Sequence, residues 1–123
     1  MICVDTYGWL ERILDGPRAS DYNRLFASVR PDEVVTSMVT VYELYWKLRP
    51  SRGEATALEA VVHLRSTRLV AIDDQLALEA ADYSLAHYLH FSDALVYATA
   101  RRYNAPLHTS EPDLKSVPGV VFH

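Results

Sequence analysis

Short apolar segments alternate with longer amphipathic segments along this chain of 123 residues. The apolar segments are residues 2–4, 34–37, 69–72, 106–108 and 120–122. Between them, apolar side chains recur at helical spacing over residues 7–14, 22–29, 41–48, 54–64, 74–88 and 93–103. Strands that alternate with helices form mostly parallel sheets that helices cover on both faces. The pattern therefore predicts the α/β class, as a three-layer α/β/α sandwich with a central parallel sheet of four or five strands.

Length and composition exclude several classes of protein. A chain of this length with 50% hydrophobic residues can bury one core but not two, so we predict a single domain over residues 1–123. No apolar run reaches the roughly 20 residues of a membrane helix, and the first residues do not resemble a signal peptide. Cys3 is the only cysteine, which excludes an internal disulfide. We therefore expect a cytoplasmic protein without a membrane partner.

Acidic residues lie close to the ends of the predicted strands. Asp5 directly follows the first strand, Glu111 and Asp113 follow the fourth, and Glu43 and Asp93 lie in helices next to the second and fourth strands. Because parallel strands end at one edge of a sheet, these five carboxylates are expected to converge there. Clustered carboxylates repel one another unless a cation neutralises them. Oxygen ligands without thiolates or paired histidines select Mg²⁺ or Mn²⁺, the ions of phosphate chemistry.

Glu43 also has a structural explanation. Residues 40–43 fit a capping box, and Lys47 lies four residues further on, at the spacing of a helical ion pair. The aromatic residues around it, such as Tyr42 and Trp46, are expected to pack in a core or an interface rather than to stack on RNA bases.

Three other acids fit the first turns of helices. Asp5 suits the N-cap of the first helix, and Asp93 follows Ser92, which we predict to be the N-cap of its helix. Asp73 follows a strand as well, but the N-cap interpretation is the stronger one there. Taken singly, none of these acids indicates a site, and the hypothesis depends on their convergence.

Four motifs, in this order, resemble those of PIN-domain ribonucleases. They are Asp5-Thr6 after the first strand, Val39-Thr40-Val41-Tyr42-Glu43-Leu44-Tyr45, Phe91-Ser92-Asp93-Ala94-Leu95-Val96-Tyr97-Ala98-Thr99-Ala100, and Pro106-Leu107-His108-Thr109-Ser110-Glu111-Pro112-Asp113-Leu114. Within that family, the motifs are most similar to those of the VapC toxins of prokaryotic toxin–antitoxin pairs. The resemblance extends over nearly the whole chain.

The resemblance implies a metal site. Asp5, Glu43 and Asp93 would be its core acidic ligands, and a fourth acid would come from the loop after the fourth strand. The family usually has Asp where this chain has Glu111, so Glu111 and Asp113 are both candidates, and Glu111 is favoured because it occupies the position of the usual Asp.

Further residues are implied to support the site or to bind RNA. The hydroxyls of Thr6, Thr109 and Ser92 neighbour the acids, with Ser92 the weakest candidate. The net charge is −4, but without the five site acids the rest of the chain carries about +1, so RNA is an acceptable partner. Arg101 and Arg102 are the favoured residues for contacts with RNA phosphates.

Taken together, the resemblance implies a metal-dependent endoribonuclease that hydrolyses RNA phosphodiester bonds as the toxin of a type II toxin–antitoxin pair. Its cofactor would be Mg²⁺ or Mn²⁺, and its partners would be RNA, a cognate VapB-like antitoxin and a second copy of the chain in a homodimer. Two alternatives stay open. One is a PIN-fold nuclease of RNA processing or DNA metabolism, and the other is a catalytically silent module that binds RNA or protein.

Overall fold

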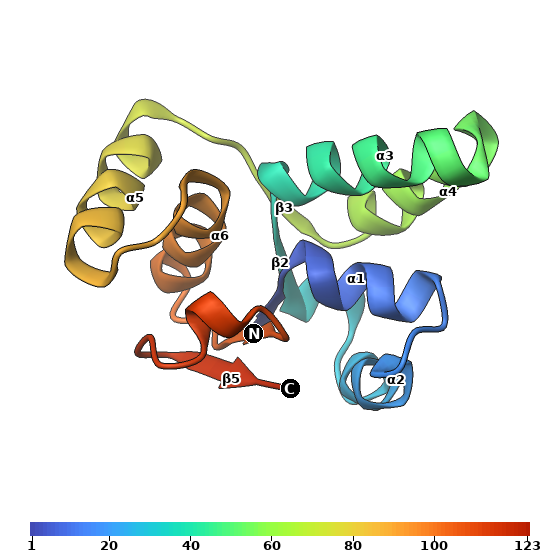
Figure 1. The fold of residues 1–123 in the computed structure, drawn as a ribbon, viewed down its shortest axis with the longest axis horizontal. Helices are drawn as coiled ribbons and strands as arrows, with labels where there is room; N and C mark the ends of the chain where they lie inside the picture. The colour runs from blue at the N-terminus through green and yellow to red at the C-terminus, as the bar shows by residue number, and fades with distance from the viewer.

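The computed structural model describes residues 1–123, and its centre is one parallel sheet of five strands in the order β3-β2-β1-β4-β5 (Figure 1). The strands are β1 Ile2–Val4, β2 Val34–Ser37, β3 Arg68–Val70, β4 Leu107–Thr109 and β5 Val120–Phe122. Strand β1 pairs with β2 through Ile2 and Val34, and with β4 through Val4 and His108. The strand order reverses direction at β1 and β4. Their carboxyl ends therefore border a topological switch point, where sheets of this kind bind ligands.

Helices cover both faces of the sheet. They are α1 Thr6–Ile13, α2 Ala19–Ala27, α3 Met38–Arg52, α4 Glu54–Arg65, α5 Asp74–His87 and α6 Phe91–Arg102, with short 3₁₀ helices η1 Pro31–Glu33 and η2 Pro112–Leu114. Helices α5 and α6 lie on one face, and α1 to α4 lie on the other (Figure 1). The predicted three-layer α/β/α sandwich is confirmed. None of the helices is both long and apolar enough to cross a bilayer.

Two separate cores bury the two faces of the sheet. Cys3 belongs to the core under α5 and α6, while its neighbour Val4 belongs to the core under α1 to α4. On this second face, α1 packs tightly because Gly8 has no side chain. A Cβ at Gly8 would come within 2.5 Å of both Val4 and the Tyr22 ring. This close contact fixes the start of α1, where Asp5 lies.

Most helix ends differ from the predicted ranges by one to four residues, and the end of α3 and the start of α6 are the two with a clear physical reason. The sequence predicts a helix over residues 41–48 that Arg49-Pro50 closes, but α3 continues through Pro50 to Arg52 and ends at Gly53, whose φ of 86° suits glycine. Pro50 and Trp46 are both exposed, so water can bond the Trp46 carbonyl that Pro50 leaves without an N–H donor. Helix α6 begins at Phe91, two residues earlier than the predicted start at residue 93. His90 is its N-cap, so the prediction for Ser92 is wrong.

Candidate functional site

A cavity of about 130 Å³ opens at the carboxyl edge of the sheet, beside β1 and β4. Four acids from four separate segments line it, namely Asp5, Glu43, Asp93 and Glu111. The other lining residues are Thr6, Tyr7, Leu10, Lys47 and Val96. We call this space the acidic cavity. The structure thus brings together all the predicted acids except Asp113.

Asp5 is held at the junction between β1 and α1. One carboxylate oxygen caps α1 by accepting a hydrogen bond of 3.0 Å from the N–H of Gly8, and the other accepts one from the hydroxyl of Thr109. The Thr109 hydroxyl also accepts a 2.9 Å bond from the backbone N–H of Glu111. Asp5 is only 7% exposed. The same carboxylate therefore serves as a helix cap and lines the acidic cavity.

Glu43 is bonded to α1 and not to the start of its own helix. Its Oε1 accepts a hydrogen bond of 2.6 Å from Thr6. Ser37 caps α3 by accepting from the N–H of Val39 at 3.2 Å, so the predicted capping box over residues 40–43 is wrong. Lys47 lines the acidic cavity with Glu43, but none of the ion pairs in the chain includes Lys47.

Asp93 lies in the first turn of α6 and is partly buried. A negative charge is favourable there because the helix dipole is positive at this end. The first turn closes with a bond of 2.9 Å from the N–H of Ala94 to the carbonyl of His90. Ser92 does not line the acidic cavity. Of the three hydroxyl residues predicted to support the site, only Thr6 and Thr109 contact its acids.

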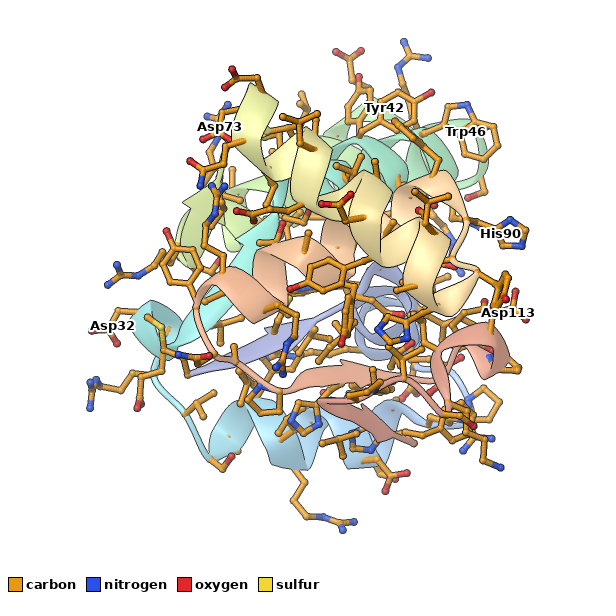
Figure 2. The ribbon with its side chains drawn as sticks, turned by 90° about the vertical axis from the view of Figure 1, so that its left-hand side faces the viewer. Asp32, Tyr42, Trp46, Asp73, His90 and Asp113 are labelled. Atoms are coloured by element: carbon orange, nitrogen blue, oxygen red, sulfur yellow. The ribbon has the colours of Figure 1, made fainter.

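Glu111 and Asp113 have different surroundings. Glu111 lines the acidic cavity and caps η2 by accepting from the N–H of Asp113 at 3.2 Å. Asp113 is exposed, and its Oδ2 lies 3.6 Å from Nε2 of His90 at the outer surface (Figure 2). This arrangement favours Glu111 over Asp113 as the fourth acid.

Burial and mutual repulsion raise the pKa of two of the acids. Burial is the main cause that raises the pKa of Asp5 to about 6. The hydrogen bonds from Thr109 and Gly8 lower this pKa, and the charges of Asp93 and Glu111 raise it further. The pKa of Asp93 is also raised to about 6, by burial first and then by Glu111 and Glu43. Lys47 is the only cationic side chain in the lining. The acidic cavity therefore holds more negative charge than the protein itself neutralises.

The donor atoms suit a hard divalent cation. Carboxylate oxygens are the ligands that Mg²⁺ and Mn²⁺ prefer, and a divalent ion would relieve the repulsion among the acids. In this structure no three acidic, histidine or cysteine side chains lie close enough to ligate one ion. Asp5 and Glu43 are instead bonded to Thr109 and Thr6. An ion would have to draw the carboxylates closer together, and a carboxylate that keeps its threonine hydrogen bond still has free lone pairs with which to ligate it.

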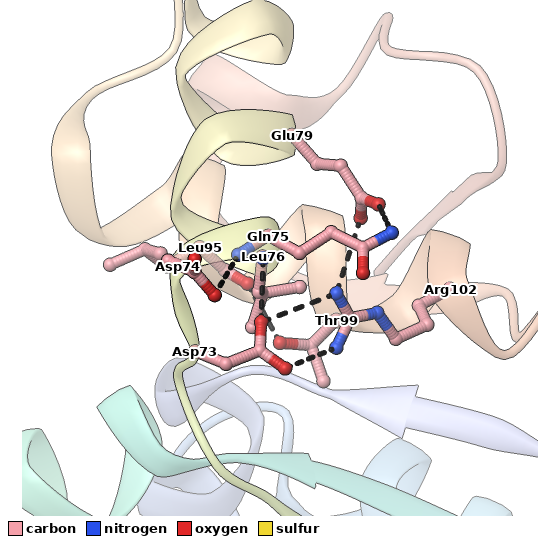
Figure 3. Close-up of polar contacts among 8 residues, drawn as sticks. All are labelled: Asp73, Asp74, Gln75, Leu76, Glu79, Leu95, Thr99 and Arg102. Atoms are coloured by element: carbon pink, nitrogen blue, oxygen red, sulfur yellow. Dashed lines mark hydrogen bonds and ion pairs between the residues drawn. The ribbon is translucent and has the colours of Figure 1, made fainter.

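Arg101 and Arg102 lie at the other end of α6 from Asp93, roughly 12 Å away along the helix axis. Arg102 pairs with Asp73 at 3.4 Å and with Glu79 at 3.6 Å (Figure 3). Asp73 caps α5 as predicted, through a 2.7 Å bond from the N–H of Leu76. Neither arginine lines the acidic cavity. Any contact that they make with RNA would lie outside it.

A buried pair of hydroxyls next to the site was not predicted from the sequence. The Tyr22 and Ser110 hydroxyls lie 2.8 Å apart and join α2 to the residue before Glu111. Helical spacing identified Tyr22 as part of an apolar face, and its partner is 88 positions away, so no local signal revealed the pair. For Lys47 the sequence spacing predicts only a pairing with Glu43. Its place in the acidic cavity follows from the packing of α3 against α1.

Comparison with known proteins identifies the family. The sequence model of the PIN domain matches residues 2–120. This chain belongs to the PIN domain family. None of the curated proteins that were compared matches it.

Three solved structures share the fold over almost the whole chain. A toxin–antitoxin complex from Klebsiella pneumoniae matches with a TM-score of 0.79 and 22% identity, over 98% of this chain and 96% of the other. VapC20 from Mycobacterium tuberculosis, described as a Sarcin-Ricin loop cleaving toxin, matches with a TM-score of 0.79 and 24% identity, over 98% and 97%. FitAcB from Neisseria gonorrhoeae matches with a TM-score of 0.80 and 20% identity, over 100% and 97%. At these identities, the similarity establishes the fold.

Proposed function

We propose that this protein is a metal-dependent endoribonuclease of the VapC type, the toxin of a type II toxin–antitoxin pair. The observation that carries the proposal is the acidic cavity, where four segments of a PIN-domain chain place carboxylates around one space at the switch point of the sheet. The similarity in fold to VapC20, a Sarcin-Ricin loop cleaving toxin, supports RNA as the substrate.

Four acids form the metal site in this proposal. Asp5, Glu43, Asp93 and Glu111 hold one or two Mg²⁺ or Mn²⁺ ions, with Asp113 outside the ligand set. A bound ion would supply Lewis acidity there, which would favour attack of water on the phosphodiester and neutralise the charge on its oxygens. Burial first, and then the charges of the neighbouring acids, raise the pKa values of Asp5 and Asp93, and a bound cation would oppose both effects. No side chain has to act as a covalent nucleophile.

The neighbouring side chains orient the acids and the substrate. Thr109 holds one oxygen of Asp5, and Thr6 holds one oxygen of Glu43, so both carboxylates are restricted before an ion enters. Lys47 is a cation at the wall of the cavity and is free of ion pairs. We assign to Lys47 a contact with a phosphate of the RNA that lies across the site.

The proposal includes protein partners. The matching structures include a toxin–antitoxin complex, and we infer that a VapB-like antitoxin inhibits this chain. An Arg or Lys from the antitoxin, placed among Asp5, Glu43 and Asp93, would neutralise the same repulsion as the metal ion and compete with it. The toxin itself is proposed to act as a homodimer.

Sequencing of RNA 5′ ends after expression of the protein tests the nuclease assignment. We expect new 5′ ends with the wild type and with Asp82→Asn, a control at an exposed acid of α5, but none with Asp93→Asn. In vitro, a chelator should stop cleavage and Mn²⁺ or Mg²⁺ should restore it. Equal cleavage by Asp93→Asn would contradict the site. If the wild type with metal cleaves no RNA, the silent binding module is the better interpretation.

The role as a toxin needs a second observation. A small open reading frame for an antitoxin next to the gene would support it. If no such neighbour exists and cells tolerate strong expression, the nuclease is better placed in RNA processing or DNA metabolism.

A further inference from the structure

A second cavity lies at the opposite edge of the sheet from the acidic cavity. Its volume is about 190 Å³, and its lining includes Val34, the first residue of β2, and Thr67, directly before β3. Parallel strands begin at one edge and end at the other, so the two cavities are separate. In Figure 2, Asp32, which follows the lining residue Pro31 of the second cavity, and Asp113, which is two residues after Glu111 of the acidic cavity, lie on opposite sides of the molecule.

The lining of this second cavity has the opposite charge. It contains Arg12, Arg30 and His63 and no carboxylate, and we call it the basic cavity. Arg30 is already paired with Asp32 at 3.1 Å. The guanidinium of Arg12 lies 4.4 Å from the centre of the Phe26 ring and forms no ion pair, so its N–H groups are available for an anion.

Trp9, one of the residues that line the basic cavity, carries a buried donor that has no partner. Trp9 is 3% exposed, and its indole Nε1 is the one buried side-chain nitrogen or oxygen without a hydrogen-bond partner. Buried polar groups are nearly always paired, and an exception calls for a water molecule, an ion or a ligand. An indole N–H can only donate, so the missing partner is an acceptor.

We propose that the basic cavity binds a small molecule through an oxyanion, either a phosphate ester or a carboxylate. In this proposal the N–H of Trp9 and the guanidinium of Arg12 donate to the oxyanion, and His63 is a further lining residue that can donate. The apolar part of the ligand packs against Phe26 and Val29, which also line the cavity. This inference does not depend on the nuclease assignment, since it involves neither the acids nor the metal.

The two tryptophans make a direct test possible. Trp46 is exposed on α3, so Trp46→Phe leaves Trp9 as the only source of an indole N–H signal in a ¹H–¹⁵N spectrum. The probes are inorganic phosphate, adenosine 5′-monophosphate and benzoate, each compared with sodium chloride at the same ionic strength. We expect at least one of the oxyanions to shift the Trp9 signal downfield, with the shift reaching saturation below a probe concentration of about 10 mM. Chloride should not produce this saturable shift.

Two variants show whether the response comes from the basic cavity. Arg12→Gln should weaken the saturable shift by about tenfold, because it removes a charge-assisted bond. Arg24→Gln removes an exposed arginine of α2 outside the cavity and should leave the shift unchanged. A response to phosphate compounds alone identifies a phosphate site, and a response to benzoate alone identifies a carboxylate site. If the Trp9 signal does not saturate with any oxyanion, or if Arg12→Gln leaves it unchanged, only water occupies the space and the proposal is wrong.

Discussion

The hydroxyl of Thr6 donates a 2.6 Å hydrogen bond to Oε1 of Glu43 and so joins two helices through residues 37 positions apart. Thr6 is buried and directly follows Asp5. One short segment at the start of α1 therefore supplies one acid of the acidic cavity and orients a second. The position of Glu43 depends on α1 as much as on its own helix.

This contact gives the first prediction. Thr6→Val keeps the shape of the side chain and removes the donor, so Glu43 loses its fixed orientation. We expect the affinity for Mn²⁺ and the rate of RNA cleavage to fall about tenfold, with Thr6→Ser restoring most of both. Calorimetric titration with Mn²⁺ measures the affinity. Thr56→Val, at an exposed position of α4, is the matched control. An unchanged Mn²⁺ affinity in folded Thr6→Val would show that the bond has no role in the site.

The second prediction separates the two candidates for the fourth acid. Glu111 lines the acidic cavity, whereas Asp113 faces His90 at the surface. We expect Glu111→Gln to lower Mn²⁺ affinity by at least about tenfold and Asp113→Asn to change it by less than about twofold. The same calorimetric titration applies to both variants. Equal small losses would mean that neither residue is a ligand, and a larger loss from Asp113→Asn would reverse the assignment.

The alternation of apolar strands and amphipathic helices was sufficient to predict the layers and the parallel sheet. Helix ends were harder to predict, because they depend on backbone bonds with no strong sequence preference. Ser92 is a better N-cap by residue type than His90, yet the bond from Ala94 to the His90 carbonyl starts α6 earlier. Pro50 suggested an end to α3, but its exposed position lets the helix continue to Gly53.

The acids of the site were predictable because strand ends are local signals and parallel strands end together. Their orientation was not predictable, because it depends on contacts between distant segments, such as Thr6 with Glu43. The same reason explains why the position of Lys47 could not be predicted. Its spacing from Glu43 suggested an ion pair within α3, whereas both side chains line a cavity shared with α1. Trp46 was expected to pack and is 62% exposed, since the monomer provides nothing to cover it.

The third prediction concerns pH and the metal-free protein. The pKa of Asp5 in the folded state is about 6, above its ordinary value of 3.8, so the folded protein binds this proton more tightly than the unfolded chain does. The charge on Asp5 therefore costs stability above pH 6, and the cost disappears as the pH falls towards 4. A shift of this size corresponds to about 3 kcal/mol at pH 7.

Comparison with Asp5→Asn isolates this effect. Asn keeps one oxygen that can accept from the N–H of Gly8, and its NH₂ group can donate to the Thr109 hydroxyl in place of the bond that Asp5 accepts there. In chelator the variant should therefore be more stable than the wild type at pH 7, with the difference vanishing near pH 4. Burial also lowers the pKa of His108 to about 4, which destabilises the fold as the pH falls, but this effect is common to both proteins and cancels. Urea unfolding at several pH values measures the difference. A difference that does not change with pH would refute the shifted pKa of Asp5.

The fourth prediction concerns the path of the RNA. Lys47 lines the acidic cavity, whereas Arg101 lies at the far end of α6. We expect Lys47→Gln to raise KM several-fold and to lower the slope of log affinity against log salt by about 0.7, the value for one phosphate contact on a single strand. Binding is measured by fluorescence anisotropy with Asp93→Asn, which leaves the RNA uncleaved. If Arg101→Gln lowers the slope and Lys47→Gln does not, the RNA passes along the end of α6 instead.

The last prediction is the homodimer. Leu85 and Phe91 are 79% and 81% exposed on α5 and α6, beside an apolar groove of about 490 Å³. A monomer rarely leaves such large apolar side chains together in water, and a second copy that covers them would gain their burial twice in a symmetric dimer. Light scattering at micromolar concentration should give a particle of twice 13.9 kDa. Leu85→Asp should give the monomer, because the dimer would bury an unpaired charge. Leu58→Asp is the control, since Leu58 lies in the other apolar groove, between α3 and α4, and this variant should leave the dimer intact. A wild-type particle of 13.9 kDa would rule out the dimer, and dissociation by Leu58→Asp alone would place the interface on α3 and α4.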